Sequence, residues 1–265
     1  MAVESFAASP AGPLTVARRP PMPRQAEFPF LSVVVPTYNE AANIGPFLEA
    51  LRAGLGSAVS GGYEVIVVDD ESPDGTGEVA TRISIDWPNL RVVRRAGERG
   101  LARAVVRGWQ IARGDVLATI NADFQHPPSI LPEMLRKIEN ADLVVATRYA
   151  SEGSVGRFPL HRQFLSAFAR RVGLLLVPKV FRRVTDPLSG CYMFRRQVIE
   201  DIELRPTGFK TLIEVLARGR VGDVAEYGYT MQERRSGRSH VRLRHWFDYL
   251  GQLGRMRSEL QRRQS

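Results

Sequence analysis

Short apolar runs alternate with helix-like segments between residues 31 and 146, and this alternation constrains the fold more than any other feature of the chain. The apolar runs fall at 31–35, 63–68, 90–93, 115–120 and 142–146. Helical spacing of apolar residues is found over 40–55, 100–112 and 128–138, and a further helix is expected to open after residue 76. The run 63–68 is almost wholly apolar, as is typical of a strand buried on both faces. The pattern predicts an α/β fold with a mostly parallel sheet flanked by helices.

The pattern changes after residue 150. An amphipathic helix is expected over 161–177, with Phe164, Phe168, Val172 and Leu175 on one face. A short strand at 191–195, a helix at 209–217 and a strand at 224–230 should follow. We divide the chain into a Pro/Ala/Arg-rich tail expected to be disordered (1–28), one folded domain (29–240) and a basic amphipathic C-terminal helix (241–265).

The net charge of +9 indicates an anionic partner: a nucleic acid, an acidic membrane surface or a phosphorylated substrate. Cys191 is the single cysteine, so an intramolecular disulfide and a Cys/His metal cluster are both excluded. No apolar run is long enough for a transmembrane helix, and the N-terminus lacks a signal-peptide pattern. We therefore expect a cytoplasmic protein, peripheral on the cytoplasmic face of a membrane.

Several function classes lack their sequence signals. The chain has no P-loop, no dinucleotide-binding fingerprint and no Gly-x-Ser-x-Gly elbow. It also has no RNA-binding signature and no aromatic stacking platform, so we expect no nucleic-acid partner despite the charge.

Polar residues follow the expected strands, where ligand sites form in open α/β sheets. After the first strand, Tyr38 could stack on a base and Glu40 could accept a hydrogen bond from a base or ribose. The alternative is a plain strand-to-helix turn in which Asn39 caps the helix. After the second strand come four acidic residues within 69–74. Asp70 is the candidate ligand-binding residue there, while Asp74 could simply cap the next helix.

The loop 119–128 carries Asp123 and Gln125 two residues apart, so that both side-chain oxygens could meet one hard cation. Mg²⁺ and Mn²⁺ are often held by one or two protein ligands, with substrate phosphates and waters completing the shell. His126 lies between Gln125 and two prolines, and a structural role is favoured for it. Basic residues that could grip phosphate lie in the other expected loops: Arg148, Arg162, Lys210, Arg234, Arg235 and Arg238.

Taken together, these stretches resemble the family 2 glycosyltransferases with a GT-A fold, and more narrowly the polyprenyl-phosphate (dolichol-phosphate) mannose synthases. The matching stretches occur in family order between about residues 30 and 245: Val-Val-Pro-Thr-Tyr-Asn-Glu (34–40), Val-Val-Asp-Asp-Glu-Ser-Pro-Asp-Gly-Thr (67–76), Arg-Gly-Leu-Ala-Arg-Ala-Val (99–105), Ala-Asp-Phe-Gln-His-Pro-Pro (122–128), Thr-Arg-Tyr (147–149), Asp-Pro-Leu-Ser-Gly (186–190), Gly-Phe-Lys (208–210) and Arg-x-x-Gly-x-Ser (234–239).

The resemblance implies a role for each matching position. The nucleoside of a nucleotide-sugar would be held by Pro36, Tyr38, Glu40, Val68 and Asp70. Mg²⁺ or Mn²⁺ on its diphosphate would be bound by Asp123 and Gln125, and the rest of the donor site would include Asn121, Ala122, Arg148, Lys210, Arg234 and His240. Arg162 would lie near the acceptor phosphate, and the residues expected to act in catalysis are Asp123, Arg148 and Arg234.

The implied reaction is inverting, metal-dependent transfer of a sugar to a polyprenyl monophosphate at a membrane surface, with mannose from GDP-mannose as the first candidate. The acceptor phosphate is already ionised near neutral pH, so no strong general base is needed. Metal and arginines would neutralise the repulsion between acceptor and donor and stabilise the leaving diphosphate. The helices expected after residue 160 and at the C-terminus could lie in the membrane interface, or both could pack on the sheet.

The chain departs from the family at two positions. Asn121 stands where the family usually has the first Asp of Asp-x-Asp, which removes a charge from the metal loop. His240 stands where the family has Lys, so its charge depends on pH. Two alternatives remain at this point: a family 2 transferase with another sugar or acceptor, and a weakened scaffold that binds nucleotide-sugar without turnover.

Overall fold

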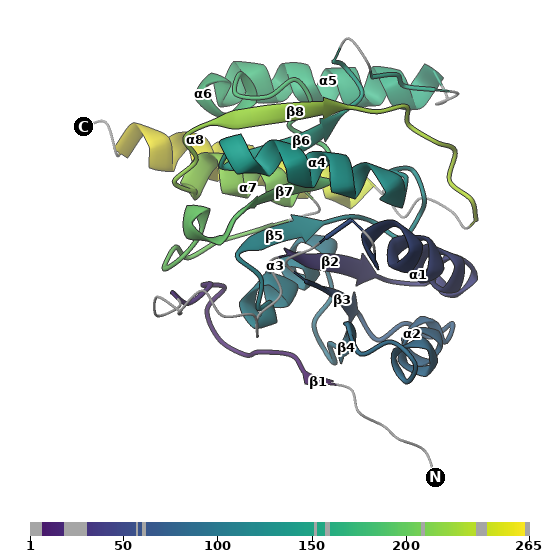
Figure 1. Cartoon of the computed structure of the whole chain (residues 1–265). Coiled ribbons are helices and arrows are strands. Elements are labelled where there is room, and N and C mark those ends of the chain that lie inside the picture. The colour runs from purple at the N-terminus through teal and green to yellow at the C-terminus, as the bar shows by residue number, and fades with distance from the viewer. Residues whose placement is uncertain are drawn as a thin grey trace.

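The computed structural model describes residues 7–18, 31–56, 58–59, 62–150, 153–156, 160–207, 210–236 and 243–262. An eight-stranded sheet lies at the centre, with the strand order β1-β4-β3-β2-β5-β7-β6-β8 (Figure 1). Neighbouring strands are parallel except where β7 pairs with β5 and β6, so the mostly parallel sheet is confirmed. The strands are β1 (Ala7–Ala8), β2 (Leu31–Thr37), β3 (Tyr63–Asp69), β4 (Leu90–Arg94), β5 (Val116–Thr119), β6 (Leu143–Thr147), β7 (Tyr192–Arg195) and β8 (Val224–Gly228).

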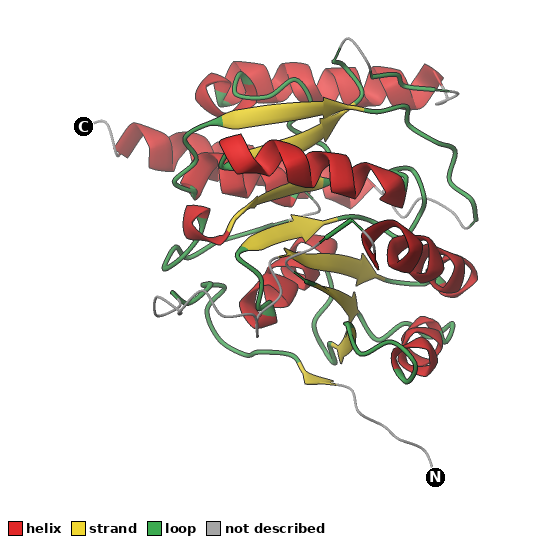
Figure 2. Ribbon diagram, viewed as in Figure 1, coloured by secondary structure: helices red, strands yellow, loops and turns green. Residues whose placement is uncertain are grey.

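Helices cover both faces of the sheet (Figure 2). One face packs against α1 (Ala41–Gly56), α2 (Thr76–Ser84) and α4 (Leu131–Lys137), which the short turns η1 (Pro128–Ile130) and η2 (Ile138–Asn140) extend. The other face packs against α3 (Leu101–Ile111), α5 (Leu160–Leu176), α6 (Pro178–Phe181), α7 (Thr211–Arg218) and α8 (Leu243–Arg262), and η3 (Arg196–Val198) follows β7. Successive β2 residues alternate between the two cores, because side chains of a strand point to opposite faces.

The strand β2 continues through Pro36 to Thr37, two residues beyond the apolar run 31–35 that predicts it, although a proline after such a run is expected to end the strand. On the β3 side, the carbonyl of Thr37 accepts a hydrogen bond from the backbone N–H of Asp70. On the β5 side, the carbonyl of Val34 accepts one from the backbone N–H of Ile120. Pro36 therefore faces the β5 side, beyond the last register pair of Val34 with Thr119. Its missing N–H costs no ladder hydrogen bond there, which is why proline is tolerated.

Residues 7–18 are not the disordered segment expected from the composition. β1 adds to the sheet edge beside β4, and the side chain of Val16 is fully buried in the core. The carbonyls of Gly12, Pro13 and Thr15 accept hydrogen bonds from side chains of α3. Local sequence cannot reveal this packing, because the acceptors are backbone carbonyls that any residue type supplies. The remainder of the expected tail lies outside the described residues.

The two late helices combine buried and exposed apolar residues. On α8, Leu253 and Met256 are buried, whereas Phe247 is 72% exposed. On α5, Ala169 is buried while Phe164 and Leu175 are 74% and 78% exposed. Both helices thus pack on the sheet and also present an apolar outer face. Over the described ranges, no helix has the length and apolarity needed to cross a membrane.

Candidate active site

The expected site residues gather along the edge of the sheet that is formed by the C-terminal ends of β2, β3, β5, β6 and β8. Tyr38 follows β2, Asp70 follows β3, the loop 120–126 follows β5, and Arg148 follows β6. Because β7 is antiparallel, the loop that precedes it, with Asp186, reaches the same edge. The parallel strands therefore bring together side chains that are separated by more than a hundred positions in the sequence.

Glu40 at the start of the first helix forms an ion pair with Arg234, which follows β8. Its other carboxylate oxygen accepts a 2.6 Å hydrogen bond from the Asn43 amide. Burial raises the pKa of Glu40, although Asn43 and Arg234 oppose the shift. The segment after β8 is thus tied across the end of β2. Glu40 and Arg234 meet in space as two of the expected donor-site residues.

Asp70 forms an ion pair with Arg95, a residue that had no expected role. Arg95 is 1% exposed, and its Nε lies 2.8 Å from Asp70 Oδ1. The backbone N–H of Gly100 donates to Asp70 Oδ2 at 2.8 Å. Burial raises the pKa of Asp70 to about 6, although the Arg95 charge and the Gly100 hydrogen bond oppose this. A buried arginine at a strand end could not be distinguished by sequence from the many surface arginines.

The other acidic residues of that loop have structural hydrogen bonds. Asp69 accepts from the hydroxyls of Thr37 and Ser72. Asp74 accepts from the backbone N–H groups of Ala41 and Thr76, at the starts of α1 and α2. The N-cap residue of α2 is Gly75, so Asp74 does not cap that helix in the strict sense, but its carboxylate holds the starts of α1 and α2 together.

Asp123 is 7% exposed in the loop after β5, and its Oδ1 accepts a 3.1 Å hydrogen bond from the Gln125 N–H. Burial raises the pKa of this carboxyl, while the positive charges of Arg234 and Lys210 lower it. A buried carboxylate gains from a nearby cation, and an oxygen donor set suits Mg²⁺ or Mn²⁺. Nowhere in the described ranges do three or more His, Cys, Asp or Glu side chains form a metal cluster. The Asp123 carboxylate and the Gln125 amide are thus two oxygen-bearing side chains of one loop, a number that a magnesium or manganese site completed by substrate oxygens can use.

His126, at the end of this loop, is buried and stacked on Tyr229 with the ring centroids 4.8 Å apart. Burial lowers the pKa of His126 to about 3, so the ring is neutral at physiological pH. Gly190 lies against the same loop, because a β-carbon there would meet the Asn121 amide at 2.7 Å. These contacts favour the structural role expected for His126.

Arg148 is held by Asp186 through two hydrogen bonds, from Nε to Oδ2 at 2.8 Å and from Nη2 to Oδ1 at 3.1 Å. Burial lowers the pKa of Arg148, but the Asp186 charge outweighs it and keeps the pKa above the ordinary value. Lys210 donates to the Leu188 carbonyl at 2.6 Å, and burial lowers its pKa to about 8 despite Asp186. Asp186 was part of a quoted motif but had no expected role.

Three expected site residues are not placed. His240 and Arg238 lie outside the described residues, and the side chain of Arg162, on the first turns of α5, is likewise not described. Arg235 is described, and its guanidinium lies 5.3 Å from the centroid of the Phe124 ring.

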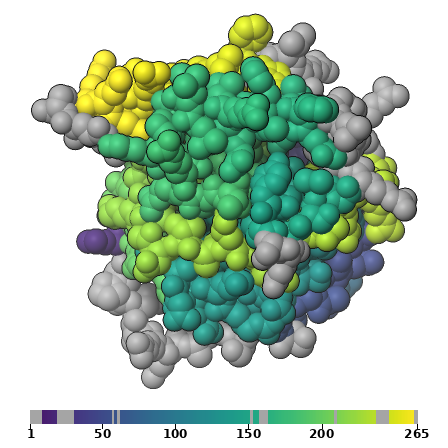
Figure 3. Space-filling view, turned by 90° about the horizontal axis from the view of Figure 1, so that it is seen from above, coloured from purple at the N-terminus to yellow at the C-terminus, as the bar shows by residue number. Residues whose placement is uncertain are grey.

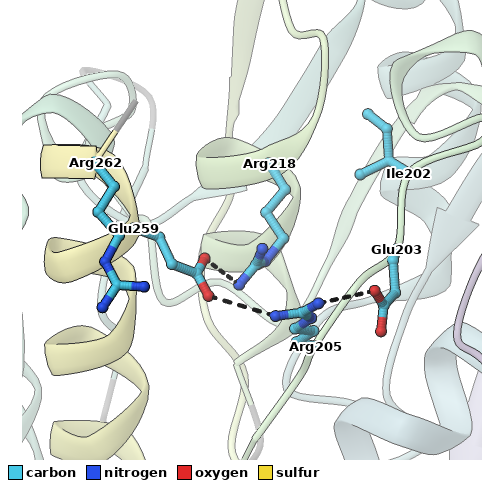
Figure 4. Close-up of a pocket in the computed structure, with 6 residues that line it drawn as sticks. All are labelled: Ile202, Glu203, Arg205, Arg218, Glu259 and Arg262. Atoms are coloured by element: carbon cyan, nitrogen blue, oxygen red, sulfur yellow. Dashed lines mark hydrogen bonds and ion pairs between the residues drawn. The ribbon is translucent and has the colours of Figure 1, made fainter. Parts of the chain in front are cut away.

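A second cluster of charged side chains forms a pocket of about 400 Å³ away from these strand ends (Figure 4). Arg218 pairs with Glu214 on its own helix and with Glu259 of α8. Arg205 pairs with Glu203 and lies 3.9 Å from Glu259. The arginine and glutamate charges balance one another, so this network ties α7 to α8 and offers no excess charge for a ligand.

Residues 32–203 match the sequence profile of Glycosyl transferase family 2. The chain belongs to this family. This family 2 glycosyltransferase is 40% identical over 228 residues to a dolichol-phosphate mannosyltransferase from Pyrococcus furiosus, covering 85% of the chain but only 63% of that relative's length. It is 31% identical over 232 residues to a dolichol-phosphate mannosyltransferase from Saccharomyces cerevisiae, covering 84% of the chain and 85% of that protein. The resemblance to polyprenyl-phosphate mannose synthases is thus confirmed.

The GT-A fold is confirmed by solved structures. The glycosyltransferase superposes on glucosyl-3-phosphoglycerate synthase from Mycobacterium tuberculosis, in complex with Mn²⁺, uridine diphosphate and glucosyl-3-phosphoglycerate, with a TM-score of 0.62. The two chains are 23% identical, and the match covers 92% of this chain and 84% of the other. At this identity the likeness concerns the fold alone.

Proposed function

We propose that this glycosyltransferase transfers mannose from GDP-mannose to a polyprenyl monophosphate at a membrane surface, with inversion at the anomeric carbon. One observation carries the proposal: the Glu40–Arg234 and Arg148–Asp186 pairs, Lys210 and Asp123 converge at one sheet edge. Cations next to a buried carboxylate suit a metal-bound diphosphate. The relatives named dolichol-phosphate mannosyltransferase support the sugar and the acceptor class.

The carboxylates at this edge favour an acceptor that is already ionised. Among the described residues, Glu40 pairs with Arg234, Asp70 with Arg95, and Asp186 with Arg148. Both oxygens of each carboxylate are already engaged, by Arg234 and Asn43 at Glu40, by Arg95 and the Gly100 N–H at Asp70, and by Arg148 at Asp186. None of the three therefore presents an uncommitted oxygen that could take a proton from an alcohol. A phosphate monoester needs no such base. Its oxygen can attack the anomeric carbon directly, which displaces the nucleoside diphosphate from the opposite face.

Each residue would then have a defined task. Tyr38, Glu40 and Asp70, with Pro36 and Val68 of the adjoining strands, would hold the nucleoside. Lys210, Arg234 and the remaining Nη1 of Arg148 would donate to phosphate oxygens of donor or acceptor. Asp123 and Gln125 would hold Mg²⁺ or Mn²⁺, which supplies positive charge to the leaving diphosphate when bound. Arg162 and His240 would complete the phosphate contacts, as the resemblance implies.

Exposed apolar side chains on α5 and α8 support the proposed lipid acceptor. Figure 3 views the molecule from above, and α5 lies on the face turned to the reader. Phe164, Phe168 and Leu175 are 74%, 59% and 78% exposed along that helix. Phe247 and Leu250 are exposed on α8, which contacts α5. Exposed apolar residues on a chain of net charge +9 suit an anionic membrane interface at the cytoplasmic face.

The decisive experiment incubates purified protein with Mn²⁺, vesicles containing polyprenyl phosphate, and a panel of GDP-mannose, UDP-glucose and UDP-N-acetylglucosamine. A β-linked mannosyl lipid, formed with GDP-mannose and lost on chelation, is expected. A product from another donor would favour the alternative sugar. Donor binding without any product would favour a scaffold, for which Asn121 in the metal loop is the motivating observation.

A further inference from the structure

Two guanidinium groups lie near the ring of Tyr149. Arg148, from the end of β6, has its Cζ 5.2 Å from the ring centroid. Arg170, from the middle of α5, has its Cζ 5.8 Å from the same centroid. Each cation gains from the ring, but the two cations also repel one another. Such a pair is stabilised by an anion placed within reach of both.

The two arginines differ in how their charge is balanced. Arg148 is compensated by the carboxylate of Asp186. Arg170 has no carboxylate within ion-pair distance among the described residues, and its buried Nε has no hydrogen-bond partner there. A buried donor without an acceptor is costly, and a charged one more so. Of the two arginines, Arg170 is therefore the one that a hydrogen-bond acceptor on a bound ligand would stabilise more.

An apolar pocket lies next to this cation. A cavity of about 260 Å³ is lined by Tyr149, Val155, Gln163, Phe164 and Ala167. Gln163, Ala167 and Arg170 follow one another at spacings of four and three residues, so they lie along one side of α5. Tyr149 is shared, since its ring contacts Arg170 and also forms a wall of the cavity. A positive group and an apolar cavity therefore adjoin each other.

We propose that Arg170 binds the phosphate of the lipid acceptor and that the adjoining cavity takes the first isoprene unit of its chain. This rests on the proposed function and adds a residue to which the family resemblance assigned no role. A phosphate monoester on a branched apolar chain satisfies both halves of the site at once. Inorganic phosphate would engage the arginine alone, and a neutral prenyl alcohol would engage the cavity alone.

Binding of geranyl phosphate, a short prenyl monophosphate, tests the proposal without any membrane. Isothermal titration would compare wild type with Arg170→Gln, and Arg171→Gln serves as the matched control because it removes the same charge one position along α5. Arg170→Gln should weaken geranyl phosphate binding about tenfold, the loss expected for one charge-assisted hydrogen bond. Arg171→Gln should change it less than about twofold. Equal losses in both variants would overturn the proposal in favour of general electrostatic attraction.

A second variant tests the cavity separately. Ala167→Phe should fill it and weaken geranyl phosphate binding while leaving the affinity for inorganic phosphate unchanged. Arg170→Gln should weaken both ligands, and Arg170→Lys should recover part of the loss. Unchanged geranyl phosphate binding in Ala167→Phe would remove the cavity from the proposal.

Steady-state kinetics distinguish a failure of this inference from a failure of the proposed function. Arg170→Gln should raise KM for geranyl phosphate while the KM for the donor and the melting temperature stay at wild-type values. A loss of stability with unchanged acceptor KM would mean that Arg170 is structural. If wild type transfers no sugar to any prenyl phosphate, the proposed function fails. If wild type is active and Arg170→Gln is equally active, only the present inference fails.

Discussion

Arg148 and Asp186 form a buried, two-point ion pair, with side chains 9% and 2% exposed and with Nε 2.8 Å from Oδ2. The pair joins the end of β6 to the loop before β7. It fixes the guanidinium plane and leaves Nη1 as the donor that is not committed to the carboxylate. The orientation of Arg148, which we propose binds phosphate, therefore depends on a carboxylate that need not touch any substrate.

Replacing Asp186 with Asn should destabilise the protein, because the Arg148 charge would remain buried without compensation. Breaking a buried pair by removing one partner costs about 3–5 kcal/mol. The free energy of unfolding by urea would measure this, and kcat should fall as the guanidinium loses its fixed orientation. Glu133→Gln is the matched control, since Glu133 pairs with Arg136 on the surface, where both side chains are largely exposed. Similar losses of unfolding free energy in Asp186→Asn and Glu133→Gln would contradict a stabilising role for the buried Arg148–Asp186 pair.

Asp123→Ala should abolish metal-dependent donor binding, because it removes the proposed charged ligand from the loop after β5. Titration of the nucleoside diphosphate with and without Mn²⁺ would measure the effect. Asp115→Ala removes an exposed carboxylate before the same strand and should change nothing. Asn121→Asp should lower the Mn²⁺ concentration for half-maximal binding, since it restores a negative charge. Wild-type metal dependence in Asp123→Ala would exclude this metal site.

Donor affinity should fall on both sides of neutral pH. Asp70 has a pKa of about 6, so below that value it becomes protonated and loses acceptor capacity toward the nucleoside. Lys210 has a pKa of about 8, so above that value it becomes neutral and loses its attraction for phosphate. The dissociation constant of the nucleotide, followed from pH 5 to 10, should therefore rise at both ends. Lys210→Arg should extend the alkaline limb and leave the acidic one unchanged. An alkaline limb that Lys210→Arg does not move would contradict this assignment.

Val16→Ala should lower the free energy of unfolding by about 2 kcal/mol, because Val16 is fully buried. Arg18→Ala is the control, since the Arg18 side chain is 73% exposed in its ion pair with Asp201. Urea denaturation would compare the two. Turnover at low temperature should be equal in both variants, because Val16 lies away from the strand ends that carry the site. An unchanged midpoint in Val16→Ala would mean that the N-terminal segment contributes little stability.

The sequence alone determined the strands from β2 onward, most helices and the placement of Tyr38, Asp70, Asp123 and Arg148 at strand ends. These follow from apolar periodicity and from local turn chemistry, which act between residues a few positions apart. The order of the motifs also determined the family. The expected disorder of residues 7–18 was wrong, because their packing depends on backbone carbonyls and on Val16 meeting a distant core.

Only the tertiary structure decided the partners of the charged residues. Arg148 meets Asp186, Glu40 meets Arg234 and Asp70 meets Arg95 because separate strands end at one edge. Periodicity carries no information about such pairs, since an arginine that is to be buried has the same local sequence character as one on the surface. The antiparallel direction of β7 is likewise a long-range choice, and it brings Asp186 to the edge where Arg148 lies.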